Sequence, residues 1–136
     1  MTTTDPPTTD SPTPVDTTVI DAYLATWNER DAAKRAELID ASLGTDLWYR
    51  DPMLEADGRE AYEAMIVNVQ AQLPDHVMRR TSEVDAHRDV VRFNWALGVE
   101  GAEPTFAGLD VAKYDADGRL HRIIGFAGET VPGSAA

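Results

Sequence analysis

The chain has 136 residues, 43% of them apolar and 26% charged, which suits one compact globular domain. Its 24 acidic and 12 basic side chains give a net charge of −12. Such a surface repels phosphate backbones and anionic lipids, so we expect neither a nucleic-acid partner nor a membrane-surface role.

The chain contains no cysteine, which excludes disulfides, thiolate catalysis and cysteine-ligated metals. No apolar run approaches the roughly 18 residues that span a bilayer. The first residues lack the basic start and apolar stretch of a signal peptide. We therefore expect a cytoplasmic protein.

Residues 1–14 hold half of the prolines, among Thr, Asp and Ser. Such a segment cannot bury enough apolar surface to offset its ordering entropy, so we expect a disordered tail. The folded domain is predicted at residues 15–129, and residues 130–136 are predicted to be a frayed C-terminus.

The first predicted helix spans residues 17–29. Asp16 stands directly before it, where its carboxylate can cap the free amides of the first turn. Apolar residues recur along this segment at helical spacing and predict one buried face. The residues of that face are Val19, Ile20, Tyr23, Leu24 and Trp27.

Two further helices and a strand complete the first half of the domain. The second helix is predicted after Asp31 and fades before Gly44. Residues 46–51 are predicted as a strand, which Pro52 ends because proline has no amide donor. The third helix is predicted from residue 59 or 60 to Leu73.

From His76 onward the hydrophobic period changes to two, which is typical of half-buried strands. Strands are predicted at 77–84, 90–99, 105–115 and 120–127, with turns at 85–89, 101–104 and 115–118. Helices interleaved with one strand and followed by an antiparallel meander indicate an α+β domain, with the helices packed on one sheet face. We expect a curved, mostly antiparallel sheet that encloses a cone-shaped hollow.

Several short segments share a pattern with known proteins. They are Tyr23–Asp31, Tyr49-Arg50-Asp51-Pro52, Gly58–Ala61, Gly108–Asp115, Asp117–Leu120 and Gly125-Phe126. Together they resemble the NTF2-like, SnoaL-like superfamily of cone-shaped α+β domains. The resemblance covers residues 19–129 and implies that fold, with three N-terminal helices on the sheet.

Ketosteroid isomerases of that superfamily carry a phenol on the first helix, a general-base Asp in a strand-ending Asp-Pro, and an Asp late in the sheet. Tyr23, Asp51 and Asp110 stand at the matching positions. By this resemblance, Asp51 moves a proton away from the carbon next to a carbonyl. Tyr23 and a protonated Asp110 then donate hydrogen bonds to the enolate oxygen, and no cofactor is needed.

The neighbours of Asp110 favour a buried site. Strand alternation puts Asp110 on one face with Gly108, Ala112 and Tyr114. If that face lines the hollow, desolvation raises the pKa of the Asp110 carboxyl and keeps it neutral. The resemblance points further apolar side chains inward as substrate contacts. These are Phe93, Trp95, Leu97 and Ile123.

One position departs from the isomerase pattern. Some ketosteroid isomerases support the catalytic phenol with a tyrosine on the third helix, and alignment puts Ile66 there, so that network is at least partly missing. Ile66 is predicted as a substrate contact. In a structural module, by contrast, Ile66 and the bulky Trp95 would fill the hollow.

The histidines predict no metal site, because His76, His87 and His121 lie far apart without ligand spacing. His121 has the strand parity of the inward face and is the one histidine expected near the pocket. Residues 115–118 look like the start of a calcium loop, but the later acidic ligand is missing, and a hairpin turn explains them.

Apolar residues on the late strands also face outward. They are Leu109, Val111, Ile124 and Phe126. Superfamily members often dimerise through that sheet face, so the resemblance implies a homodimer.

The first hypothesis is a cofactor-independent enzyme that transfers a proton next to a carbonyl of an apolar cyclic small molecule, as in isomerisation, cyclisation or dehydration. The alternative is a non-catalytic small-ligand-binding domain with the same hollow. A purely structural dimerisation module is the third. Asp51 decides among them: the enzyme needs its carboxylate to face the same space as Tyr23 and Asp110.

Overall fold

The computed structural model describes residues 15–128. The tail predicted at residues 1–14 and the end predicted at 130–136 lie outside the described residues, as does the last residue of the predicted domain. No helix within residues 15–128 is long and apolar enough to cross a membrane.

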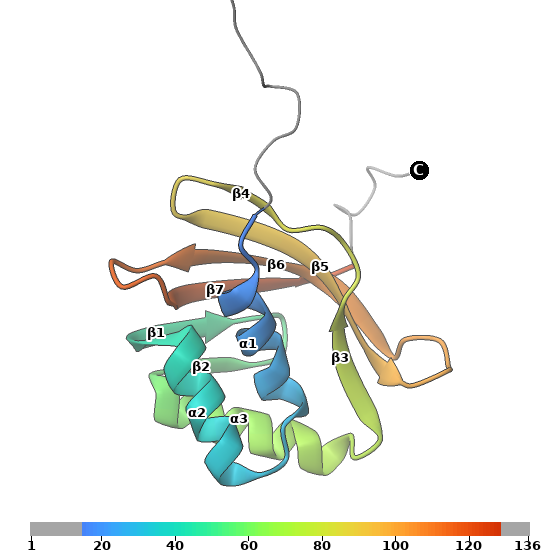
Figure 1. Ribbon diagram of the computed structural model, residues 1–136. Helices are drawn as coiled ribbons and strands as arrows, with labels where there is room; N and C mark the ends of the chain where they lie inside the picture. Colours follow the sequence, from blue (N-terminus) through green and yellow to red (C-terminus); the bar gives the residue numbers. More distant parts are fainter. Residues whose placement is uncertain (1–14, 129–136) are drawn as a thin grey trace, which may run out of the picture.

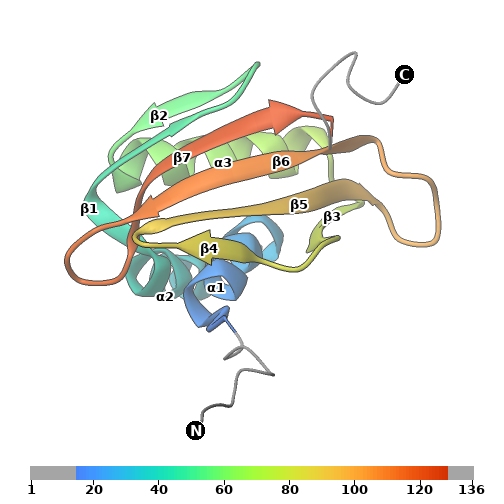
Figure 2. The same cartoon turned by 90° about the horizontal axis from the view of Figure 1, so that it is seen from above.

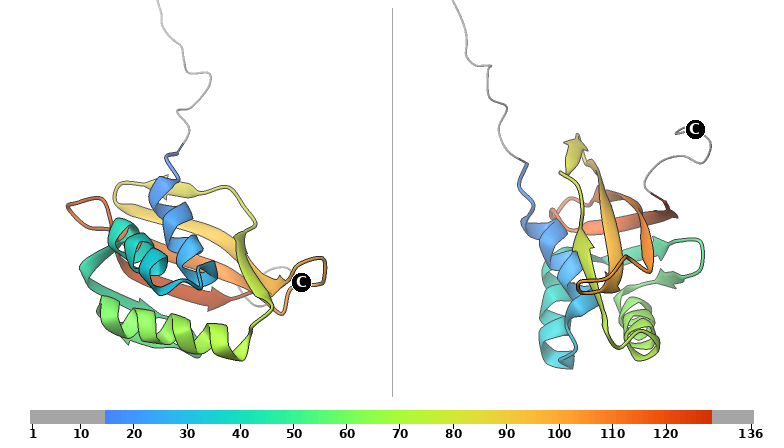
Figure 3. Two further views of the ribbon diagram at one scale, coloured as in Figure 1. Left: turned by 60° about the horizontal axis from the view of Figure 1, so that its bottom comes forward. Right: turned by 90° about the vertical axis from the view of Figure 1, so that its right-hand side faces the viewer.

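Three helices pack on one side of a sheet (Figure 1, and the left view of Figure 3). They are α1 (Thr18–Asn28), α2 (Ala32–Ser42) and α3 (Arg59–Gln72). α2 begins directly after Asp31, its N-cap, as the sequence predicts; α1 begins at Thr18 with Thr17 as its N-cap, one residue later than predicted, so Asp16 is not the N-cap. The Asp16 carboxylate accepts a hydrogen bond from the Thr18 amide at 2.9 Å, and the Asp31 carboxylate accepts one from the Lys34 amide at 2.9 Å.

The sheet is mixed, and Figure 2 shows its long strands side by side above the helices. The strands are β1 (Leu43–Arg50), β2 (Glu55–Asp57), β3 (His76–Arg80), β4 (Asp85–His87), β5 (Val90–Val99), β6 (Phe106–Tyr114) and β7 (Leu120–Ala127). Their order is β2-β1-β7-β6-β5-β3, with β4 paired to β5. Only the β1–β7 pairing among these is parallel. The predicted α+β class with three helices on a mostly antiparallel sheet is therefore confirmed.

Short strands depart from the prediction. β4 lies within the segment 85–89, which was predicted as a turn. The actual turn is shorter: the chain reverses at Arg88, which has a positive φ of 52°, so the residues before it can pair with β5. β2 was not predicted, since its three residues are too few to show a period of two. The strand predicted to reach residue 84 ends at Arg80. Beyond it the Asn94 amide bonds to the Ser82 hydroxyl instead of continuing a ladder.

The core lies between the helices and the inner face of the sheet. The predicted face of α1 is buried there through Ile20, Tyr23, Leu24 and Trp27. On the opposite face of the sheet, Leu109 pairs with Phe126 and Val111 pairs with Ile124 across β6 and β7. Phe126 is 51% exposed and Ile124 is 37% exposed. The homodimer through this face stays a prediction.

Candidate active site

A cavity of about 560 Å³ opens between the sheet and helices α1 and α3, a size usual for small-molecule sites. Most of its wall is apolar. Its lining residues include Trp27, Leu54, Val69, Leu73, Met78, Trp95, Leu97 and Phe106, and its acidic groups are Asp51 and Asp110. The hollow is therefore not filled by side chains, which contradicts the purely structural module.

The side chains of Asp51 and Asp110 lie on either side of a glycine. Asp110 on β6 pairs directly with Gly125 on β7, and Asp51 follows the end of β1 on the other side of β7. A Cβ built on Gly125 would lie 2.9 Å from Oδ1 of Asp110 and 3.1 Å from Cβ of Asp51. The missing side chain at Gly125 therefore gives both carboxyl groups room at one end of the cavity.

Asp110 is 3% exposed and accepts two hydrogen bonds. The Tyr23 hydroxyl donates to its Oδ2 at 2.8 Å, and the Trp95 indole donates to its Oδ1 at 3.0 Å. Burial raises the pKa of Asp110 to about 7, against the lowering effect of the two hydrogen bonds and with a further rise from the charge of Asp51. This carboxyl therefore gains and loses its proton near neutral pH.

Asp51 lines the same cavity and is held by three donors. Its Oδ1 accepts from the backbone amides of Met53 at 2.8 Å and Leu54 at 2.7 Å. Its Oδ2 accepts from the Tyr49 hydroxyl at 2.6 Å. Burial, followed by the nearby charges of Asp110 and Asp51, raises the pKa of Tyr49 well above its ordinary value, so its phenol stays protonated and donates.

Tyr23 lies behind Asp110 rather than in the cavity wall. It is 1% exposed, and its ring packs against Tyr62 at 6.5 Å and Phe93 at 6.3 Å between centroids. Burial and the Asp110 charge raise the pKa of Tyr23 well above its ordinary value. Its hydroxyl is therefore a permanent donor that reaches the cavity through Asp110.

The predicted substrate contacts divide into two groups. Trp95 and Leu97 line the cavity. Phe93, Ile66 and Ile123 are at most 2% exposed and lie in the core outside the cavity wall. Ile66 is therefore core filling and does not plug the hollow.

The third helix does place a tyrosine beside Tyr23, one turn before Ile66. The Tyr62 hydroxyl pairs with the Thr26 hydroxyl at 2.8 Å rather than with Tyr23. Sequence reasoning missed this residue and also the Tyr49 hydroxyl. A signal existed for Tyr49, since it stands two residues before Asp51 and shares its strand face.

His121 does not reach the cavity. The β6–β7 register shifts between Lys113 and Tyr114, so the parity that predicted an inward His121 is broken by a bulge. Its Nδ1 lies 3.5 Å from a carboxylate oxygen of Asp46 instead. Within residues 15–128, no group of three or more His, Cys, Asp or Glu side chains could hold a metal ion.

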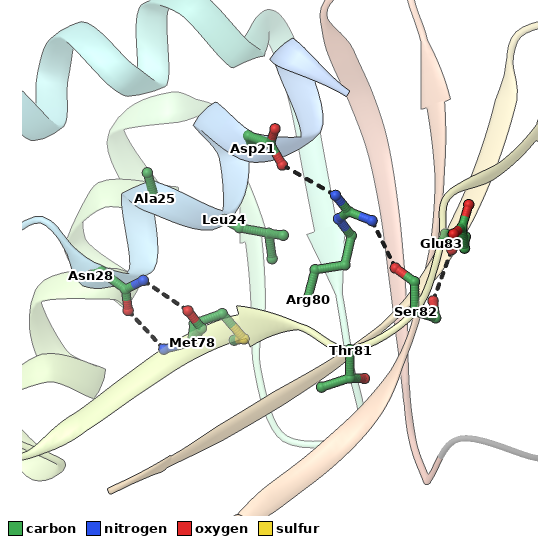
Figure 4. Close-up of a pocket in the computed structure, with 9 residues that line it drawn as sticks. All are labelled: Asp21, Leu24, Ala25, Asn28, Met78, Arg80, Thr81, Ser82 and Glu83. Carbon is green, nitrogen blue, oxygen red and sulfur yellow. Dashed lines mark hydrogen bonds and ion pairs between the residues drawn. The ribbon is translucent and has the colours of Figure 1, made fainter. Parts of the chain in front are cut away.

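A second, more open depression of about 710 Å³ lies between α1 and β3 (Figure 4). The Asn28 side chain bonds both the carbonyl and the amide of Met78, at 2.8 and 2.7 Å. Arg80 lies 3.8 Å from the Asp21 carboxylate and donates to the Ser82 carbonyl at 2.7 Å. These polar groups bond one another and hold α1 against β3. We therefore interpret them as structural contacts rather than as a binding site.

Several solved structures of other proteins share this fold. A candidate isomerase of the SnoaL-like family from Agrobacterium tumefaciens is 28% identical, with a TM-score of 0.76 over 82% of this chain and 95% of that one. An NTF2-like protein of unknown function from Exiguobacterium is 19% identical, with a TM-score of 0.67 over 83% and 100%. A candidate polyketide cyclase from Sinorhizobium meliloti is 13% identical, with a TM-score of 0.61 over 79% and 92%.

No protein-family model matches the chain, and no curated protein matches it. The structural class of this protein therefore follows from its fold alone: three helices and a mixed sheet enclose a cavity that is lined by two acidic residues. The chain has the fold of NTF2-like, SnoaL-like proteins.

Proposed function

We propose that this protein is a cofactor-independent enzyme that transfers a proton next to a carbonyl of an apolar cyclic small molecule. The reaction is a ketosteroid-isomerase-like isomerisation, or a related cyclisation or dehydration. The observation that carries the proposal is that Asp51 and Asp110 line one largely apolar cavity on either side of Gly125. Titratable groups held close together in a cleft are typical of acid–base sites.

Asp51 is the base in this proposal. Its carboxylate removes a proton from the carbon next to the carbonyl. The electron pair of that C–H bond forms a carbon–carbon double bond, and the π pair of the carbonyl moves to its oxygen, which gives an enolate. The same carboxyl then returns the proton to a carbon further along the conjugated system, while the pair moves back from oxygen. The proton that is removed is returned to the same molecule, which is neither oxidised nor reduced, so the proposed reaction needs no cofactor.

Asp110 is the donor to the enolate oxygen. Its raised pKa, about 7, leaves a large share of the carboxyl protonated at neutral pH. In a cavity with an apolar wall, a hydrogen bond to developing negative charge is stronger than in water. Tyr23 acts through Asp110, to which its hydroxyl donates.

The comparisons support an enzyme that acts on small molecules, since solved structures of this fold carry the names isomerase, polyketide cyclase and epoxide hydrolase. The particular reaction rests on the geometry of Asp51 and Asp110. The homodimer and the cytoplasmic location are further predictions.

The test is turnover of a β,γ-unsaturated ketosteroid, followed by the ultraviolet absorbance of the conjugated enone. Asp51→Asn is expected to lower the rate at least about a hundredfold, because general-base catalysis contributes about 10²–10⁴. Asp117→Asn is the matched control, since Asp117 is exposed in the β6–β7 turn and lies outside the cavity wall. Equal rates in wild type and Asp51→Asn would remove Asp51 from the mechanism.

The alternative is a non-catalytic domain that binds a small ligand in the same cavity. Two of the three hydrogen bonds to Asp51 come from its own turn, which also suits a structural carboxylate. A folded wild type that binds apolar ketones without converting them would favour this alternative over the enzyme.

A further inference from the structure

The two donors on Asp110 stand in different surroundings. Tyr23 is enclosed in the core, whereas Trp95 is partly exposed and lines the cavity. A ligand in the cavity can therefore contact the Trp95 side chain directly. It reaches the Tyr23 hydroxyl only through Asp110.

The two oxygens of Asp110 also face different ways. Oδ2 accepts the Tyr23 hydroxyl on the core side. Oδ1 accepts the Trp95 indole and is the oxygen that lies over Gly125. The polar end of the cavity therefore consists of Oδ1 of Asp110, the indole nitrogen of Trp95 and the carboxyl of Asp51.

A second glycine places the indole. Trp95 on β5 pairs directly with Gly108 on β6. A Cβ on Gly108 would lie 2.5 Å from Cζ2 and 2.9 Å from Cε2 of the Trp95 ring, too close for any larger residue. The ring rests on the bare backbone of β6, and this brings its nitrogen within hydrogen-bond distance of Asp110.

Both oxygens of Asp110 have a donor beside them in the ligand-free protein. A neutral carboxyl group has one protonated oxygen that donates and one carbonyl-like oxygen that accepts. A carbonyl oxygen of a ligand can only accept, so its binding favours the proton of neutral Asp110 on Oδ1, and the Tyr23 hydroxyl, which donates to Oδ2, stabilises that arrangement. Once Oδ1 is protonated, the indole N–H loses its best acceptor and is free for a ligand oxygen.

We propose that Trp95 and Asp110 form the donor pair for the oxygen of the bound ligand, and that Tyr23 directs the acid proton onto the cavity side of Asp110. Trp95 is then a catalytic residue that touches substrate, and Tyr23 is a positioning residue. The inference rests on the proposed function in one respect: it takes a carbonyl oxygen as the group that binds at this end.

The donor pair requires a protonated Asp110, so ligand binding is linked to pH. Titratable groups facing Asp110 come from three parts of the fold, namely Tyr23 on α1, Tyr62 on α3, and Tyr49 with Asp51 at the end of β1. The tyrosines remain protonated at neutral pH because burial raises the pKa of each. Affinity for a neutral ketone is therefore expected to fall as the pH rises through about 7, where Asp110 ionises.

The first measurement uses the ligand-free protein. The indole N–H resonance of Trp95, identified in a nitrogen-15 spectrum by its loss in Trp95→Phe, is expected to shift with pH as Asp110 titrates. In Tyr23→Phe the midpoint is expected to move to higher pH, because the carboxylate loses a stabilising donor. An indole resonance that does not respond across neutral pH would overturn the proposal.

The second measurement reads the bound oxygen itself. The probe is 2-acetylnaphthalene with a carbon-13 carbonyl, studied by difference infrared spectroscopy below neutral pH. In wild type the carbonyl stretch is expected at lower frequency than in a hydrocarbon solvent, and Trp95→Phe is expected to lose about half of that shift, since one of two donors is gone.

Trp27→Phe is the matched control, because Trp27 also lines the cavity but its indole nitrogen has no hydrogen-bond partner among the described residues. It is expected to keep the full carbonyl shift. An unchanged stretch in Trp95→Phe, or a wild type that binds no ketone at any pH, would overturn the donor pair. Bound ketone with the expected shift but no turnover of the ketosteroid would instead reject the proposed reaction and leave the donor pair intact.

Discussion

Asp110 lies directly across the β6–β7 pairing from Gly125, and the bare backbone of this glycine leaves room for the side chain of Asp51 beside it. The sheet order puts β7 between β1 and β6, so Asp51 and Asp110 reach the glycine from opposite sides. Two acidic groups from distant parts of the chain thus share one end of a cavity.

Gly125→Ala is expected to separate the two carboxyl groups. The new methyl would lie 2.9 Å from Oδ1 of Asp110, which is closer than real Cβ contacts allow. We expect turnover to fall about tenfold or more, with a loss of about 1–3 kcal/mol in the free energy of unfolding from overpacking. Steady-state kinetics and urea unfolding measure the two effects. Wild-type values for both would show that the carboxyl groups need no space there.

Tyr49→Phe tests whether the base depends on its phenolic partner. The Tyr49 hydroxyl donates to Asp51 at 2.6 Å, so its loss leaves Oδ2 without a donor among the described residues. We expect kcat to fall about tenfold, because the proposed base loses a donor that holds it in place. KM should change little, because the aromatic ring at position 49 still lines the cavity.

Tyr62→Phe is the matched control for Tyr49→Phe. Tyr62 is equally buried, but its hydroxyl pairs with Thr26. Both variants are expected to lose about 1 kcal/mol of stability for one hydrogen bond. Equal kinetic effects in the two variants would mean that Tyr49 acts only through packing.

Most of the fold could be predicted from local patterns. Strands β5 and β7 match their predicted ranges because both are rich in strand-forming residues and are bounded by turn signals. β2 and β4 have three residues each, and their pairing partners, rather than their own sequences, make them strands. His121 shows a further limit, since a single bulge reverses the face to which parity assigns a residue.

The candidate site could be predicted only in part, because local sequence does not record contacts that form when distant elements pack together. The resemblance singled out Asp51 and Asp110, and strand position is enough to bring them to one cavity. The place of Tyr23 behind Asp110 depends on how deeply α1 packs against the sheet, which no local pattern records. The role of Gly125 depends on what lies beside it, and this is a property of the assembled sheet.

Arg35 provides a stability test away from the cavity. The side chain is 5% exposed and joins the helices: it donates to the Glu29 carbonyl at 2.9 Å and lies 3.4 Å from the Glu63 carboxylate. Arg35→Met is expected to lower the free energy of unfolding by about 1–3 kcal/mol, since buried acceptors lose their donor. Lys34→Met, at an exposed position, should stay within about 0.5 kcal/mol of wild type in the same urea titration.

The raised pKa of Asp110 predicts how stability depends on pH. Burial raises this pKa from 3.8 to about 7, so between these values the folded protein binds a proton that the unfolded chain releases. The stabilisation is therefore complete at acid pH and is lost as the pH rises toward about 7, by on the order of 2–4 kcal/mol. Asp110→Asn lacks this group, and its stability relative to wild type should increase over the same pH range. Urea titrations of both proteins at a series of pH values measure this difference, and a constant difference would mean that Asp110 ionises alike in the folded and unfolded chains.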